Sequence, residues 1–351
     1  MMTRLELEQA VRGGEIIKDE DFSGADLAGA VLAGGIFHDV CFNKADLSGA
    51  SFRESILEHT TFTGAKANDI DCSNAIFVDC DFSSAMLKEA KFHFTQLTGP
   101  RFCKADMTDA SLVKAVLYEV DMSGARLDSA VLDRTVLFNA RLNAADMRNV
   151  KLSSAVLMGA DLTGAECSGL SAVQTFFQDS IMTGLDLSGL SITASQLRNC
   201  KLTGARLIRG NFERSGFMGA DLTQADLTGA NLANTVFSGA ILMQANFTGA
   251  TLTQAHFQEA KLQDAHFDGA RLDMSGFNKA DCTKASFRGA DLTYADFSHA
   301  VLDGADLSDA TLLQAKLHAV SENATRWPAS KALARGTDPD RLEAEQWRPA
   351  T

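Results

Sequence analysis

The sequence predicts an all-β solenoid with four-sided coils, about 15 of them, and short helical caps at the ends. Three observations support this prediction. A large apolar residue recurs every five positions, a small residue precedes it by two, and residue types recur every twenty positions. The five-residue pattern runs without a slip through 60 units, from Phe22 to Leu317, in a chain of 351 residues. Such internal repeats are the first feature to establish in a sequence, because missing them misassigns the whole fold.

A period of five fits neither an α-helix nor a straight β-strand, whose side chains repeat every 3.6 and every two residues. A chain that turns a corner every five residues keeps the central apolar residue inside each time. The small residue two positions earlier, most often Ala, also points inward. The position two after the centre holds 20 of the 27 Gly, with Asn and Asp among the others, so we expect corners there.

The number of sides follows from the central residues between Phe237 and Leu302. Phe and Leu alternate along most of this stretch, so each type recurs every ten residues. Ten divides a 20-residue, four-sided coil but does not divide a 15-residue, three-sided one. At a spacing of 20, one column holds mostly Phe: Phe177, Leu197, Phe217, Phe237, Phe257, Phe277 and Phe297.

The flanks predict caps for the two open ends of the β-ladder, which otherwise expose unpaired backbone groups. We therefore expect an N-terminal cap at 1–19, the solenoid at 20–319 and a C-terminal cap or tail at 320–351. Thr3 and Glu6 form a capping-box pair that begins a short helix ending at Gly13. Asp338-Pro339 is typical of a second helix start.

The units ADLAG, ADLSG, ADLTG and ANLAN resemble the A(D/N)LXX signature of the pentapeptide-repeat family, over residues 20–319. The resemblance implies a right-handed, four-sided β-helix, and it implies function only weakly. Members of the family include DNA mimics that bind gyrase, secreted bacterial effectors and accessory proteins of contractile secretion clusters.

Composition narrows the class of partner. The net charge is −13, which argues against direct nucleic-acid binding and against an anionic membrane surface. No apolar stretch approaches the roughly 18 residues of a membrane helix, so no membrane insertion is expected. The N-terminus shows no signal peptide, and we expect a soluble bacterial protein of the cytoplasm.

No catalytic, cofactor-binding or metal-binding set is predicted, and the expectation is that the protein is not an enzyme. Catalysis needs convergent groups in a concave site, whereas a β-helix without inserted loops offers flat faces. The seven His are read as scattered surface residues, with His38 and His318 in one outward column. Five of the seven Cys fall at inward positions, and Cys41 and Cys103 should be exposed, where a reactive thiol is an alternative.

One outward column is rich in carboxylates and is named the acidic ladder. Its acidic members are Asp26, Asp46, Asp106, Asp146, Glu166, Asp186 and Asp226. The first 20 residues carry a net −2 and the tail from residue 319 is neutral, so the repeat region holds −11. Over a predicted length of roughly 70 Å, this is about one net charge per 6 Å, against one per ~1.7 Å in duplex DNA. A structural role at the corners is the favoured reading, and DNA mimicry is the alternative.

Two outward columns on one side of the coils, directly before and directly after the central residue, are apolar and together are named the apolar face. It consists of Ile36, Ile56, Ile76, Val78, Val116, Tyr118, Val136, Phe138, Val156, Met158 and Phe176. Contiguous exposed apolar area usually marks an interface, although β-branched residues also simply suit the outside of a strand. The interface reading leaves two partners open, a different protein or a second copy in a homodimer.

The regularity of the repeat drops between Glu166 and Cys200, where larger residues such as Leu170 and Leu185 replace the small inward residue. Either a kink or a binding feature would fit this stretch. The sequence as a whole predicts a non-enzymatic protein-interaction scaffold, with an accessory role beside a bacterial secretion apparatus implied only by the resemblance. The alternative is a DNA-mimicking protein that binds gyrase and modulates a topoisomerase.

Overall fold

The computed structural model describes residues 2–347 and contains a right-handed parallel β-solenoid, as predicted. The chain forms two compact units, Met1–Leu185 and Asp186–Thr351. The expected caps at 1–19 and 320–351 include Met1 and residues 348–351, which lie outside the described residues.

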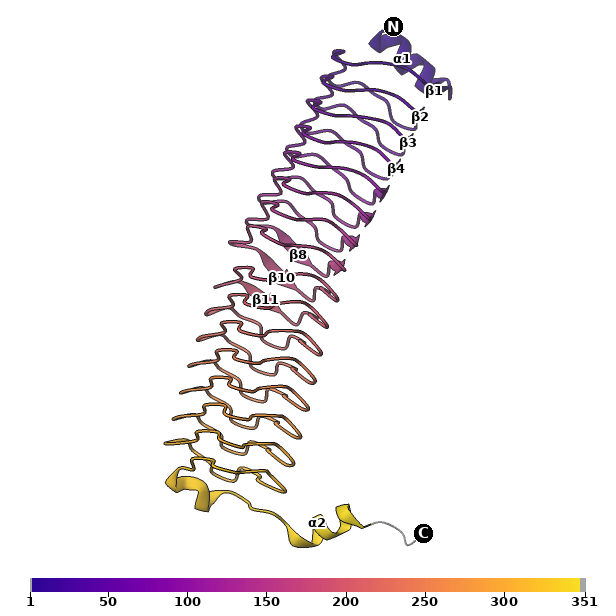
Figure 1. Ribbon diagram of the computed structural model, residues 1–351. Helices are drawn as coiled ribbons and strands as arrows, with labels where there is room; N and C mark the ends of the chain where they lie inside the picture. Colours follow the sequence, from indigo (N-terminus) through magenta and orange to yellow (C-terminus); the bar gives the residue numbers. More distant parts are fainter. Residues whose placement is uncertain (1, 348–351) are drawn as a thin grey trace. The chain divides into compact units, whose positions relative to one another are not determined.

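The first unit is organised around one eight-stranded parallel sheet, in the order β1-β2-β3-β4-β5-β6-β7-β9. Figure 1 shows β1 to β4 following one another on one side of the unit. The strands are β1 (Ile16–Lys18), β2 (Ile36–His38), β3 (Ile56–Glu58), β4 (Ile76–Val78), β5 (Gln96–Thr98), β6 (Val116–Tyr118), β7 (Val136–Phe138) and β9 (Val156–Met158). On a different side of the same unit, β8 (Lys151–Ser153) pairs in parallel with β10 (Ser171–Val173).

Each strand pairs with the residues 20 positions later, as four-sided coils require. Ile36 lies beside Ile56, and Val136 beside Val156. Isolated bridges keep the same spacing on the other sides, for example Asp26 with Asp46. At 20 residues a coil, the first unit makes about nine turns, so the predicted figure of about 15 is reached only by adding coils of the second unit.

The second unit keeps the 20-residue spacing with shorter pairings. It contains the strand β11 (Ser191–Thr193), and elsewhere isolated parallel bridges with this spacing run from Asp186–Arg206 to Asp306–Arg326, followed by Lys316–Arg335 with a spacing of 19. Phe237 and Phe257 stack with ring centroids 5.0 Å apart, which confirms the predicted column of Phe inside the coils. The chain then forms the 3₁₀ helix η1 (Ala329–Leu333) and the helix α2 (Pro339–Gln346).

Both predicted inward positions are buried. Leu137 and Phe237 at the centre, and Ala140 and Ala240 at the small position, are at most 1% exposed. The corners adopt the left-handed backbone conformation, and all 20 Gly at the expected position have positive φ. Lys, Glu and Arg adopt the same conformation at other corners, so the stacked coils impose this geometry even on residues that disfavour it.

The helix α1 (Arg4–Arg12) covers the open end of the first unit. Thr3 and Glu6 form the predicted capping box. The Arg4 guanidinium donates to the carbonyl oxygens of Ala28 and Gly29, at 2.5 and 2.9 Å. Glu8 accepts from the Val31 N–H at 3.1 Å, so the helix satisfies backbone groups that the first coil would leave unpaired.

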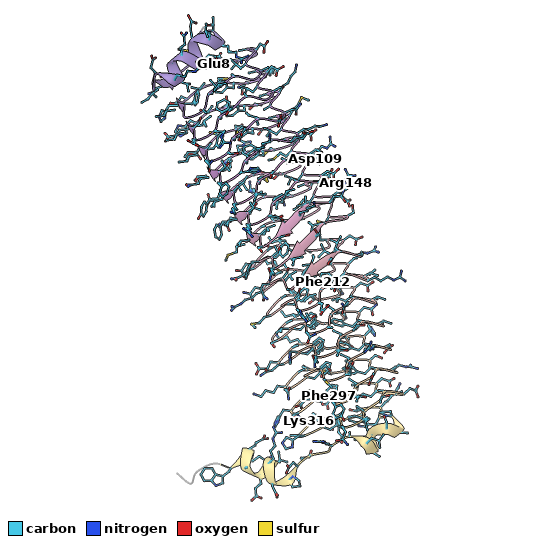
Figure 2. All side chains as sticks on the ribbon, turned by 180° about the vertical axis from the view of Figure 1, so that it is seen from behind. Glu8, Asp109, Arg148, Phe212, Phe297 and Lys316 are labelled. Atoms are coloured by element: carbon cyan, nitrogen blue, oxygen red, sulfur yellow. The ribbon has the colours of Figure 1, made fainter. Side chains whose placement is uncertain are left out.

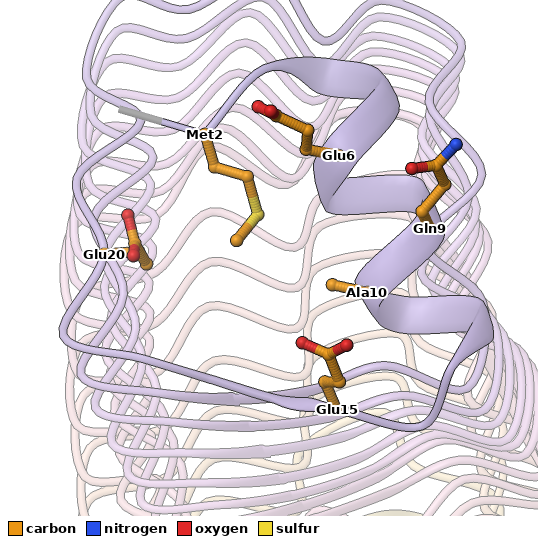
Figure 3. A pocket seen from close by; sticks show the side chains of 6 residues that line it. All are labelled: Met2, Glu6, Gln9, Ala10, Glu15 and Glu20. Atoms are coloured by element: carbon orange, nitrogen blue, oxygen red, sulfur yellow. The ribbon is translucent and has the colours of Figure 1, made fainter.

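Figure 3 looks onto this end, with α1 along one side of a shallow hollow and Met2 pointing over it. The irregular stretch predicted between Glu166 and Cys200 contains the boundary between the units, and Leu170 and Leu185 remain buried there. No helix within residues 2–347 has the length and apolar character needed to cross a membrane.

Candidate protein-interaction face

The apolar face lies on the outside of the eight-stranded sheet of the first unit. The first and third residue of each strand point outward and the second points into the core, as the burial patterns of β2 to β9 show. Because parallel strands pair in register, outward residues of one kind line up along the sheet. Ile36, Ile56 and Ile76 form one run, and Val116, Val136 and Val156 form another.

Exposure along the face is uneven. Ile76, Tyr118 and Phe176 are 37%, 47% and 49% exposed. The other predicted members are half-buried, because each shields its neighbour on the next strand: Ile36, Ile56, Val78, Val116, Val136, Phe138, Val156 and Met158. The structure thus brings all eleven predicted residues onto one side of one unit, and Phe176 continues the column by a bridge to Val156.

Two aromatic rings form the centre of the face. Tyr118 and Phe138 occupy the same position on β6 and β7, and their rings stack with centroids 5.2 Å apart and planes 16° from parallel. Such a stack holds a large, rigid apolar surface at little cost in side-chain entropy. On β5, the strand beside β6, the outward residues are the polar Gln96 and Thr98, which interrupt the run of apolar residues.

Phe94 is a surface residue that the sequence reasoning missed. It lies at the corner before β5 and is 52% exposed. The Lys114 ammonium lies 4.8 Å from the centre of its ring. Phe94 therefore adds apolar area beside the interruption at Gln96. The signal was present in the sequence, since Phe94 is the one Phe at a corner position, where Gly is the most frequent residue.

Charged corners flank the face on both sides. We define the leading corner of a strand as the residue two before it, and the trailing corner as the residue directly after it. The exposed leading corners of β6 and β7 are Lys114 and Arg134. Exposed trailing corners carry carboxylates, including Asp39, Asp79 and Glu119. The face therefore has a basic edge near its centre and an acidic edge opposite.

The acidic ladder is distributed over both units, and most of its carboxylates serve the backbone. Asp46 accepts from the Ser48 N–H at 3.1 Å, and Asp186 accepts from the Ser188 N–H at 3.0 Å. These hydrogen bonds, from side chain and backbone of the serine, lower the pKa of both carboxyl groups. The same contact is made by Asp26, Asp106, Asp146 and Asp226.

Basic residues also neutralise the ladder within each unit. Arg126 lies 3.4 Å from Asp106, and Arg206 lies 3.9 Å from Asp186. Arg148, on the surface in Figure 2, forms a 2.7 Å ion pair with Asp146. Asp106, Asp146 and Asp186 are thus ion-paired, so the ladder is not a continuous line of unpaired negative charge.

The prediction for His318 was wrong. This residue is buried, at 4% exposure, whereas an outward column was expected. His318 Nε2 and His299 Nε2 each lie 3.2 Å from Glu345 Oε2 of α2. The reason for the difference is that α2 folds over this column, a contact that no repeat pattern encodes.

These three side chains are spaced closely enough to hold a metal ion. However, the Asp338 N–H donates to His318 Nδ1 at 3.2 Å. The proton of the neutral ring must then lie on Nε2, which leaves no lone pair there for a metal. The arrangement instead suits a hydrogen-bonded latch that holds α2, with His318 Nε2 donating to Glu345.

The cysteine prediction also needs a correction. Cys41 and Cys103 are half-buried rather than exposed. Partial burial, together with the nearby Asp121 carboxylate, raises the pKa of the Cys103 thiol, which disfavours the reactive thiolate. The other five cysteines are buried, as expected.

Two family models match the chain. One, described as a pentapeptide repeat region, matches residues 35–104 and 190–267. The other, described as pentapeptide repeats in eight copies, matches residues 101–134, 140–179 and 280–318. Together they cover well over half of the chain. No curated protein sequence matches the chain significantly.

Several solved structures are similar to this chain. HetL, a pentapeptide repeat protein involved in heterocyst differentiation regulation in the cyanobacterium Nostoc sp. strain PCC 7120, is 26% identical, with a TM-score of 0.24 over 76% of this chain and 97% of HetL. QnrB1, a plasmid-mediated fluoroquinolone resistance protein, is 16% identical, with a TM-score of 0.36 over 55% of this chain and 89% of QnrB1. A pentapeptide repeat protein of the Arabidopsis thaliana thylakoid lumen is 30% identical, with a TM-score of 0.19 over 34% of this chain and 69% of its own length.

The unbroken five-residue repeat, the 20-residue pairing register and both family models agree on the family. The chain belongs to the pentapeptide-repeat family.

Proposed function

We propose that this protein is a non-enzymatic interaction scaffold that binds a protein partner through the apolar face of its first unit. The observation that carries the proposal is the in-register run of outward apolar residues, with the stacked rings of Tyr118 and Phe138 at its centre. A contiguous outward apolar surface of this kind is typical of protein-binding sites.

The other clusters of ionisable residues stabilise the fold, which supports a non-enzymatic role. Carboxylates of the acidic ladder accept backbone hydrogen bonds or pair with arginines. The His299, His318 and Glu345 cluster holds α2. The hollow at the N-terminal end is open to solvent, and one of its carboxylates, Glu6, is already bonded to Thr3. A reaction site needs convergent groups shielded from water.

A photo-crosslinking experiment in the cells of origin tests the proposal. A photoreactive phenylalanine analogue replaces Phe138 in one strain and Met86 in a control strain. Met86 is 42% exposed and belongs to the column of the acidic ladder, away from the apolar face. We expect covalent protein adducts at position 138 and none at position 86. Equal labelling at the two positions, or no adduct at 138, would overturn the proposal.

A further inference from the structure

We propose that the occupant of the apolar face is a second copy of this chain, docked face to face with the two first units parallel. This inference rests on the proposed function and adds the identity and orientation of the partner. A symmetric dimer uses the same surface on both copies, so the face must be complementary to itself. Two limiting arrangements exist, which differ in the direction of the two-fold axis.

With the axis along the stacking direction of the coils, the two first units run parallel. Leading corners of one copy then face trailing corners of the other, at the same coil. With the axis across the strands, the units run antiparallel, and leading corners face leading corners. The charges at the corners therefore distinguish the two arrangements.

The parallel arrangement places opposite charges together. Lys114 and Glu119 are the leading and trailing corners of the same strand, β6, so each lies opposite the other residue of the second copy. Both are exposed, and within residues 2–347 neither forms an ion pair in its own chain. An antiparallel arrangement with its axis between β6 and β7 would instead place Lys114 of one copy opposite Arg134 of the other.

Shape favours the same arrangement. The two corners of β5 are Phe94 and Gly99, so the parallel dimer sets a protruding ring opposite a residue without a side chain. Gly99 has φ of +64°, a conformation that favours glycine, and the Asp79 carboxylate fills the space where a Cβ would lie. On β7, Val136 lies opposite Phe138 of the second copy, which sets a small side chain against a large one.

The first experiment is the solution mass of the whole chain by light scattering. We expect a dimer for the wild type and for the control Met86→Asp, and a monomer for Val136→Asp/Phe138→Asp. A monomeric wild type overturns the second-copy inference. The proposed function would then still be tested by the crosslinked adducts at position 138. A dimer that survives the double substitution also overturns the second-copy inference, provided that circular dichroism shows the fold intact, and the proposed function is then decided by the adducts at position 138.

Charge reversal tests the orientation. We expect Lys114→Glu and Glu119→Lys each to weaken dimerisation about tenfold in sedimentation experiments, because the reversed pair occurs twice per dimer. The double reversal should restore wild-type affinity. Tighter association of Lys114→Glu alone would indicate the antiparallel dimer and overturn the parallel one.

Zero-length crosslinking supplies a direct readout. Wild-type protein with natural isotopes is mixed with ¹⁵N-labelled protein, and a carbodiimide joins amines to carboxylates that are in contact. We expect peptides of mixed isotope composition that link Lys114 to Glu119. Mixed-isotope products that link Lys114 only to carboxylates of other coils would overturn the parallel register.

Discussion

The strands of the first unit and the matching positions of the second end in different corners. After β7, among the described residues, the Ala140 N–H makes no backbone hydrogen bond to the Leu137 carbonyl. At the matching corner of the second unit, the Ala240 N–H donates to the Phe237 carbonyl at 2.9 Å. We call a corner without this hydrogen bond an open corner. Pro100, which has no N–H, follows β5 at an open corner.

The outward positions differ as well, whereas the core does not. Val136 and Phe138 point outward from β7, and Val236 and Ser238 occupy the matching positions of the second unit. Further along that column stand His256 and Gly276. The two inward positions are therefore sufficient to maintain the coil in both units. Corner type and outer surface are free to change, and it is there that a binding face can be built.

The largest effects should come from the core and should be alike in the two units. We expect Leu137→Ala to cost about 2–5 kcal/mol of unfolding free energy and Phe237→Ala about 3–5 kcal/mol, because each leaves a cavity. The outward substitutions Val136→Ala and Val236→Ala should cost less than about 1 kcal/mol. Urea unfolding followed by circular dichroism measures all four. Similar costs for Leu137→Ala and Val136→Ala would contradict the division into inner and outer positions.

Proline substitutions test the two kinds of corner directly. Ala240→Pro removes the hydrogen bond to Phe237 and should cost about 3 kcal/mol or more. Asn139→Gly/Ala140→Pro recreates the Gly99-Pro100 pair at an open corner and should change the stability by no more than about 1 kcal/mol. Thermal unfolding of the two variants beside wild type gives the answer. Equal destabilisation by the two variants would mean that the N–H groups of residues 140 and 240 contribute equally to stability.

The latch at the end of the second unit should give a local effect. Glu345→Gln weakens the contacts to His299 and His318, so we expect faster amide exchange in α2 with unchanged exchange in the coils. Glu343→Gln, on the same helix, is the matched control. Exchange in α2 that is unchanged by Glu345→Gln would show that other contacts hold the helix.

The latch should also respond to acid. Hydrogen bonds from Arg341 and then His318 lower the pKa of Glu345. A lowered folded-state pKa means that the carboxylate stabilises docking above its ordinary value of 4.5, and that this contribution is lost as the pH falls through the lowered pKa. Measured from pH 6 downward and corrected for the slower intrinsic exchange in acid, the protection of the α2 amides should therefore fall only below that ordinary value. Release of α2 beginning at higher pH would assign the latch to another group.

The smallest effect is expected on DNA supercoiling. Most ladder carboxylates in both units are paired with arginines or hydrogen-bonded to the backbone, so we expect excess protein to leave gyrase activity unchanged. A plasmid supercoiling assay with and without the protein measures this. Inhibition that disappears with Asp146→Asn or Asp226→Asn would revive the reading as a DNA mimic.

Much of the fold could be predicted, because a period of five leaves few ways to keep Leu137 and its equivalents inside. The 20-residue register followed from the column of Phe around Phe257, and the capping box at Thr3 from local chemistry. The burial of His318 could not be predicted, since it depends on where α2 packs after the repeat has ended. The open corner after β7 was equally hidden, because Ala140 and Ala240 are the same residue in different hydrogen-bonding geometries.

The pairing of each residue with the one 20 positions later has a consequence for how such a chain can change in length. Within a unit, loss or gain of 20 residues removes or adds one whole coil and leaves every surface column continuous. Loss or gain of five residues preserves the core equally well, but it carries all later residues of that unit a quarter turn around the coil. Small insertions and deletions can thus break a binding surface, or assemble a new one, while the pattern of buried large and small residues stays the same.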